Sequence, residues 1–202
     1  MSDLNATLAG YAELRCRTHY SFLRGASHPR ELVERAAELG LAALAITDLD
    51  GVYGIPKAFV AAKKHPRLKL ITGSELTLAG GRPPVTLLAR DRAGYGVLCR
   101  LITASRASKP KGEAWLEWEE LVAGLERSGA QGLIALAELP DVRHGGSSDH
   151  DGGHFGALRD LFGERVYLPL GRFLDGWDAE RTRRALETSR RFGIPVVAVG
   201  DV

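Results

Sequence analysis

Short apolar runs alternate with amphipathic segments along most of the chain. Residues 41–47 (LAALAIT) form a continuous apolar run, which is typical of a strand buried on both faces of a parallel sheet. Residues 27–40 instead space their apolar side chains at helical intervals. Ser27 or His28 caps this helix, and Gly40 ends it. The same patterns predict strands at 11–17, 41–47, 68–78, 85–89, 131–137, 165–170 and 194–202, and helices at 27–40, 54–65, 91–107, 154–163 and 178–193.

This order of elements predicts an α/β fold. Repeated strand–helix units with apolar strands favour a parallel sheet or barrel. No GxGxxG or GxxxxGK[ST] motif follows a predicted strand, which weakens a doubly wound nucleotide-binding sheet and favours a β/α barrel. We also expect an acidic cap, Asp178, at the start of the last helix, and one further helix that carries Trp115 and Trp118.

Length and composition add a few constraints. A chain of 202 residues suits one domain, so we expect residues 1–10 to be a flexible leader and residues 11–202 to form a single domain. A hydrophobic content of 45% and a net charge of +2 indicate a soluble globular protein without a dedicated nucleic-acid surface. Cys16 and Cys99 form no CxxC pair and are expected to be reduced thiols. No apolar run is long enough to cross a membrane, so we expect a cytoplasmic protein.

Polar residues gather where the predicted strands end, which is where β/α barrels carry their working residues. These residues are Arg15, Arg17, His19, Asp48, Asp50, Glu75 and Asp201. A buried guanidinium keeps its proton and therefore requires a carboxylate or phosphate partner. The sequence thus predicts that Arg15 and Arg17 pair with some of Asp48, Glu75 and Asp201.

Four segments carry a resemblance to a known family. They are AELRCRTHYSFLRGAS, ALAITDLDGVYG, LKLITGSE and PVVAVGDV, and they resemble the signature segments of the polymerase-and-histidinol-phosphatase (PHP) domain of bacterial C-family DNA polymerases. Residues 21–40 and 91–121 look most like the error-prone, translesion branch. The resemblance implies a distorted (β/α)7 barrel, truncated from a much longer polymerase chain.

The chain departs from the family pattern where active members bind a metal cluster. The resemblance places metal-ligand positions at Arg15, Arg17, Arg24, Leu49, Glu75, Phe173 and Asp201, where active members have mostly histidines. A guanidinium offers donors and no acceptor, so it cannot bind a cation. We therefore expect the Zn, Mn or Mg cluster to be lost and this domain to hold no cofactor. An ion-pair network of Arg15, Arg17, Asp48, Glu75 and Asp201 should take its place.

The resemblance implies a role within an error-prone DNA-directed DNA polymerase, a nucleotidyltransferase of translesion synthesis and DNA repair. We expect this domain to be a non-catalytic structural module, with no catalytic residues of its own. Its partners would be the remaining polymerase domains, which use Mg and contact the DNA, and the fragment itself would be a monomer or a weak dimer. The alternative is a residual metal-dependent phosphoesterase, either a 3′-5′ exonuclease or a pyrophosphatase.

Several alternatives stay open at individual residues. The two arginines suit a phosphate or a DNA end, or they face solvent if the strand register differs. His19 could ligate a single metal with Asp48 or Asp50, whereas Asp48 could instead cap a loop. Residues 144–154 (HGGSSDHDGGH) contain metal-ligating side chains, but their glycines and serines favour a surface insertion.

Overall fold

The computed structural model describes residues 10–141, 143 and 152–202. The predicted leader therefore lies outside the described residues, apart from Gly10. The chain divides into two compact units: unit 1 is Met1–Glu75 with Gly200–Val202, and unit 2 is Leu76–Val199. Among the described residues, no helix is long and apolar enough to cross a membrane.

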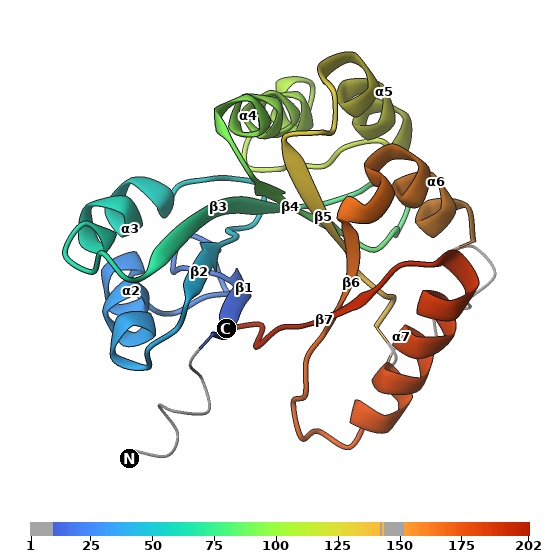
Figure 1. The fold of residues 1–202 in the computed structure, drawn as a ribbon. Helices are drawn as coiled ribbons and strands as arrows, with labels where there is room; N and C mark the ends of the chain where they lie inside the picture. Colours follow the sequence, from blue (N-terminus) through green and yellow to red (C-terminus); the bar gives the residue numbers. More distant parts are fainter. Residues whose placement is uncertain (1–9, 142, 144–151) are drawn as a thin grey trace. The chain divides into compact units, whose positions relative to one another are not determined.

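Unit 1 is a parallel sheet with two helices. Strands β1 (Ala12–Cys16), β2 (Ala43–Ile46) and β3 (Lys69–Leu76) pair in that order, all parallel. Helices α2 (Pro29–Glu38) and α3 (Ile55–Ala62) lie side by side and cover one face of the sheet (Figure 1). The core between helices and sheet consists of Cys16, Val33, Ala36, Leu44, Ile46, Ala58, Ala61 and Leu68. All four β2 side chains are buried, as the apolar run at 41–47 predicted.

Unit 2 contains the remaining strands and helices. Its strands are β4 (Val85–Ala89), β5 (Leu133–Ala137), β6 (Val166–Leu170) and β7 (Val196–Ala198). Its helices are α4 (Arg92–Ala107), α5 (Trp118–Ser128), α6 (Gly152–Phe162) and α7 (Asp178–Phe192), with a short 3-10 helix η2 at Gly163–Arg165. The predicted α/β class and the order of its strands and helices are confirmed, but Trp115 precedes α5, so the helix predicted to carry both tryptophans carries only Trp118.

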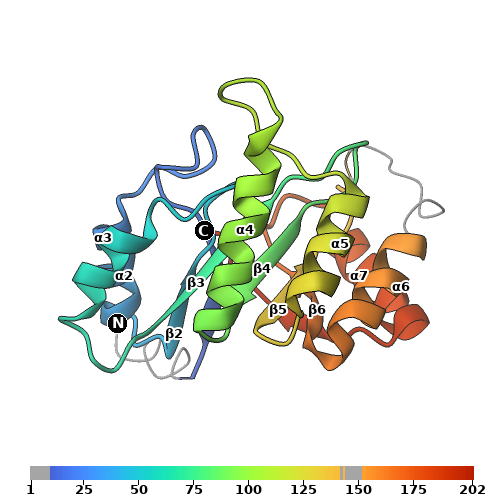
Figure 2. The same cartoon turned by 90° about the horizontal axis from the view of Figure 1, so that it is seen from above.

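One strand contradicts the prediction of an all-parallel sheet. Strands β5, β6 and β7 are parallel, but β4 runs antiparallel to β5. When one helix connects two strands, the second strand begins at the same end of the sheet as the first, and the pair is parallel. Here two helices, α4 and α5, lie between β4 and β5, and they pack against each other (Figure 2). Strand β5 therefore begins at the end of the sheet where β4 finished, and the pair is antiparallel.

The N-terminal caps predicted for helices α2 and α7 can be compared with the structure. His28 caps α2: its side chain accepts a hydrogen bond from the Arg30 N–H at 3.1 Å, and Glu31 accepts one from the His28 N–H at 2.9 Å. The acidic cap predicted for α7 is wrong, because Trp177 occupies that position without a side-chain bond. Asp178 instead lies in the first turn, where its carboxylate accepts the N–H groups of the preceding loop.

The histidine-rich segment is only partly a loop. Residues 144–151 lie outside the described residues, but His154 belongs to α6 and is 1% exposed, which contradicts a surface position. Its ring lies 4.9 Å from that of Trp118 and meets Phe155 edge-on at 5.3 Å. Within the described part of the chain, neither ring nitrogen has a hydrogen-bond partner. Burial, with a smaller effect from Arg82, lowers the pKa of His154 to about 4.

The buried His154 should make stability depend on pH. Its pKa is lowered from 6.5 on folding, so the unfolded chain binds the proton first, and stability falls as the pH drops from 6.5 towards 4. Between pH 7 and pH 5 the free energy of unfolding should decrease by about 2 kcal/mol through this group. Urea denaturation at both pH values should show the decrease in wild type and in His19→Gln, but not in His154→Leu. Equal decreases in all three proteins would show that His154 is not responsible.

Candidate functional site

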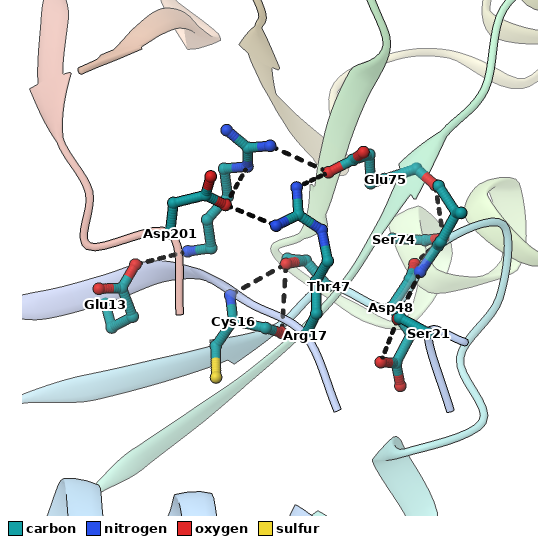
Figure 3. A network of polar contacts seen from close by, with 11 residues as sticks. Glu13, Cys16, Arg17, Ser21, Thr47, Asp48, Ser74, Glu75 and Asp201 are labelled. Carbon is teal, nitrogen blue, oxygen red and sulfur yellow. Dashed lines mark hydrogen bonds and ion pairs between the residues drawn. The ribbon is translucent and has the colours of Figure 1, made fainter. Parts of the chain in front are cut away.

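Two arginines and two carboxylates of unit 1 form a ring of alternating charge at the strand ends. Arg15 belongs to β1 and Arg17 follows it, Glu75 lies at the end of β3, and Asp201 belongs to the terminal segment (Figure 3). Hereafter these four residues are called the charge ring. The structure thus brings together four of the five residues that the sequence placed in an ion-pair network.

The ring shares two oxygen atoms between two guanidinium groups. Arg17 donates from Nη1 to Asp201 Oδ1 at 2.7 Å, and from Nη2 to Glu75 Oε2. Arg15 donates from Nη2 to the same Glu75 oxygen at 3.1 Å. The Nε atom of Arg15 lies 3.3 Å from the same Asp201 oxygen. Each of these two carboxylate oxygens therefore contacts both cations.

Burial makes these contacts energetically important. Arg17 is 8% exposed and Glu75 is 4% exposed, so neither charge is solvated by bulk water. Burial lowers the pKa of Arg17, but Glu75 and Asp201 raise it more, and the net pKa lies above the ordinary value. The guanidinium therefore stays charged, and removing one partner would leave a buried charge without compensation.

Strand β1 has an irregular register against β2 in the segment that carries Arg15 and Cys16. Between Glu13 and Cys16 the register shifts, so that β1 contains one more residue than the facing part of β2. At this point the Thr47 hydroxyl, in place of a backbone carbonyl, accepts the hydrogen bond of the Cys16 N–H at 3.1 Å. The Cys16 side chain joins the apolar core, where burial, with added effects from Glu13 and Asp48, raises the pKa of its thiol to about 12. Cys16 is therefore a free, buried thiol that stays protonated near neutral pH.

Glu13 fastens the terminal segment that carries Asp201, a role the sequence did not reveal. Its carboxylate accepts the Gly200 N–H at 2.8 Å and the Arg15 N–H at 2.9 Å. A Cβ atom at position 200 would lie 2.3 Å from Glu13 Oε2, so a larger residue there would displace the carboxylate. Backbone bonds from Arg17 N to Val202 O (2.7 Å) and from Val202 N to Arg15 O (3.1 Å) complete the attachment. The sequence feature that could have pointed to Glu13 is its position on the same strand face as the two arginines.

Glu75 is positioned by backbone pairing that continues beyond the end of β2. The Glu75 N–H donates to Asp48 O at 3.2 Å, and the Asp50 N–H donates to Glu75 O at 2.8 Å. The Ser74 hydroxyl donates to Asp48 O at 2.9 Å and accepts the Gly51 N–H at 3.0 Å. This small network holds the segment after β2 against the end of β3 and directs the Glu75 side chain to the arginines (Figure 3).

Asp48 is not part of the charge ring, so this part of the predicted network is wrong. Its carboxylate accepts the Thr18 N–H at 2.8 Å, the Thr18 hydroxyl at 2.9 Å, the Ser21 hydroxyl at 2.8 Å and the Gly54 N–H at 3.0 Å. Uncharged donors thus satisfy both of its oxygens. The structure favours the alternative in which Asp48 holds a loop.

The remaining candidate positions also lie outside the charge ring. Leu49 is half-buried and donates its N–H to Ser21 Oγ at 3.0 Å, while Arg24 is exposed on the loop after β1. Phe173 belongs to unit 2, where the Arg181 guanidinium lies 4.8 Å from its ring. His19 is exposed and stacks on His28 at 5.2 Å.

The donor set of the charge ring does not fit a divalent cation. Glu75 and Asp201 could ligate one, but their shared oxygens already face two guanidinium groups that have no lone pair to offer. A metal ion between the carboxylates would lie beside two fixed positive charges. Among the described residues, no group of three or more histidine, cysteine, aspartate or glutamate side chains is arranged to hold a metal.

The comparisons with known proteins show that the chain is a PHP domain. The model of that family matches residues 13–191, and the chain belongs to the family. It is 43% identical over 204 residues to the error-prone DNA polymerase of Anaeromyxobacter sp. (strain K), covering 95% of this chain and 17% of that protein. It is 40% identical to the error-prone DNA polymerase of Pseudomonas aeruginosa PAO1, covering 96% of this chain and 18% of that protein. The chain therefore spans less than a fifth of the length of these relatives.

A solved structure shares the fold at low sequence identity. A two-domain protein from Bacteroides vulgatus, described as containing a predicted PHP-like metal-dependent phosphoesterase, has a TM-score of 0.63 at 14% identity. The match covers 95% of this chain and 51% of that protein. It supports the α/β fold expected from the sequence.

Breaking the charge ring on one side should destabilise the protein. Glu75→Gln should lower the free energy of unfolding by about 3 kcal/mol, because the buried Arg17 loses a charged partner. Combining it with Arg17→Met should cost less than the sum of the single changes, since both charges are then removed. Urea denaturation of the four proteins measures this coupling, and the exposed Arg30–Glu34 pair of α2 provides a control with little coupling. Additive effects at Arg17 and Glu75 would contradict the ring.

Removing the Asp48 carboxylate should loosen the loop after β1. Asp48→Ala leaves the Thr18 and Gly54 N–H groups and the Ser21 hydroxyl without their acceptor, at a cost of about 3 kcal/mol. Hydrogen exchange at Thr18 and Gly54 should accelerate as well. Glu38→Ala, which removes an exposed carboxylate of α2, should change neither quantity. Unchanged exchange at Thr18 would contradict this role of Asp48.

Proposed function

We propose that this chain is the PHP domain of an error-prone DNA polymerase and that it acts there as a structural module without hydrolytic activity. The observation that carries this proposal is the charge ring. Arg15 and Arg17 occupy the positions where the family resemblance implies metal ligands, and they pair with the two acidic residues at the same site.

The charge ring can replace the structural role of a metal cluster. In a metal centre, carboxylate oxygens bridge cations and so tie together the loops that carry them. Here Glu75 Oε2 and Asp201 Oδ1 each bridge two guanidinium cations. The ring therefore joins β1, β3 and the terminal segment through fixed charges of the protein itself.

The same substitution removes the chemistry that hydrolysis needs. Metal-dependent phosphoesterases use the ion to generate a bound hydroxide and to stabilise the leaving oxygen. An arginine can bind a phosphate but stays protonated and cannot activate water. A residual exonuclease or pyrophosphatase is thus less well supported than a structural role. DNA synthesis, with its Mg and its DNA contacts, would belong to the other domains of the polymerase.

The metal-free proposal predicts how the protein responds to Zn²⁺ and Mn²⁺. Neither ion should raise the thermal midpoint of the wild-type chain through the charge ring. The variant Arg15→His/Arg17→His/Leu49→His should gain stabilisation by Zn²⁺, because imidazoles supply lone pairs beside Glu75 and a ligand that binds the native state stabilises it. Calorimetric melting with and without the ion measures the effect.

A further substitution serves as the control for this experiment. Adding Glu75→Gln to the triple-histidine variant should abolish the gain, which separates binding at this site from binding elsewhere in the chain. Stabilisation of the wild type by Zn²⁺ or Mn²⁺ that Glu75→Gln removes would refute the proposal. Release of nucleotides from a DNA 3′ end that requires Mn²⁺ and Glu75 would refute it as well.

A further inference from the structure

Two loops of the chain expose a phenylalanine followed by a leucine. The first, residues 19–27, lies between β1 and α2 and contains the sequence SFLRG; the second, residues 171–177, joins β6 to α7 and contains RFLDG. Both follow the carboxyl end of a strand within their own unit. We call them the Phe-Leu loops.

The exposure of these apolar side chains is large. Phe22 is 81% exposed and Leu23 is 87% exposed, and in the other loop Phe173 is 43% and Leu174 is 84% exposed. In Figure 2 the first loop, in blue, projects beyond α2 and α3. Apolar side chains on such projections lie outside the core of the unit that carries them.

The first loop is held in its shape by hydrogen bonds to Asp48, which follows β2, and by hydrogen bonds within the loop. Asp48 accepts hydrogen bonds from Thr18 and Ser21, and Ser21 O in turn accepts the Arg24 N–H at 2.8 Å. Gly25 approaches so closely that a Cβ atom there would lie 2.3 Å from Thr18 O. The loop is therefore built to hold Phe22 and Leu23 in one defined exposed position.

The second loop uses a different carboxylate for the same purpose. Asp178, in the first turn of α7, accepts the N–H groups of Phe173 and Leu174, both at 3.0 Å. These bonds lower the pKa of Asp178, so the carboxylate stays ionised. Arg181 donates to Asp175 and Asp178 and its guanidinium lies over the ring of Phe173, and Leu174 is the most exposed large apolar side chain of the loop.

Both leucines also adopt a backbone conformation that disfavours leucine. Leu23 has φ +59° and Leu174 has φ +56°, in the left-handed region where a Cβ atom is crowded. A strained, exposed leucine in a well-braced loop gains nothing from the contacts within its own unit. Strain of this kind marks positions whose benefit lies in a function such as binding.

We propose that the Phe-Leu loops dock the PHP domain onto the polymerase chain that accompanies it in its relatives. This rests on the proposed function, since it names the partner of the structural module. Relatives such as that of Anaeromyxobacter sp. (strain K) are long enough that the matched region is only 17% of their length. A large partner within the same chain is thus expected.

The position of the chain's last residues supports this occupant for the first loop. Val202 is hydrogen-bonded to the backbone of Arg15 and Arg17, so the segment ends beside the carboxyl end of β1 (Figure 1). The first Phe-Leu loop leaves β1 at the same end. The part of the longer relatives that follows the matched region would therefore begin at the same end of β1 as this loop.

The test uses the longer polymerase that carries these residues, with a specific protease site inserted after Val202. After cleavage, the dissociation constant between the PHP piece and the remainder is measured and compared among variants. Phe22→Ser/Leu23→Asn and Phe173→Ser/Leu174→Asn should each weaken association at least about tenfold; asparagine tolerates the left-handed backbone, so the loops keep their shape. Phe59→Ser/Val60→Ser removes a comparably exposed apolar pair from α3 and should leave the constant unchanged.

The outcomes separate this inference from the proposed function. If the wild-type pieces and both loop variants associate equally, the loops are not the docking surface, but the structural module stands. If the wild-type pieces separate on cleavage, the structural module itself is refuted. If the loop variants instead lose affinity for a fluorescent oligo(dT) while the two pieces stay associated, the loops bind nucleic acid and docking is overturned.

Discussion

A buried guanidinium group cannot release its proton, and this constraint organises the strand-end site of the protein. Arg17 is almost fully enclosed and stays charged, so carboxylates must accompany it. Glu75 and Asp201 supply them, one from each side, and Arg15 shares the same two oxygens. Three segments that are distant in sequence are held together through these four side chains.

Much of the surrounding polar network has the task of directing the two acidic side chains. Glu13 and the glycine at position 200 fix the terminal segment, and Ser74, which precedes Glu75 in β3, fixes the loop after β2. The Glu13 carboxylate accepts backbone N–H groups, and the Ser74 hydroxyl bonds to backbone groups, so both supports rest on short hydrogen bonds to the main chain. The hydrogen bonds of these two buried side chains therefore hold the carboxylates of the charge ring in a defined position.

Unit 1 also carries the first Phe-Leu loop, which exposes apolar side chains. Asp48, a strand-end carboxylate like Glu75, is saturated by loop donors and so shapes the segment that exposes Phe22 and Leu23. One end of the unit 1 sheet thus combines an internal ring of charges with an outward apolar projection. A domain that braces a larger polymerase would need both, the first for its own integrity and the second for attachment.

The order of strands and helices, and the need of Arg15 and Arg17 for acidic partners, could be predicted from the sequence, because periodicity and charge are local properties. The sequence also indicated the PHP family through four short segments. The tertiary structure alone decided which carboxylates the arginines meet, the direction of β4, the fastening role of Glu13 and the burial of His154. The reason is distance along the chain: Arg17 and Asp201 are 184 positions apart, and only folding brings their charges within 2.7 Å.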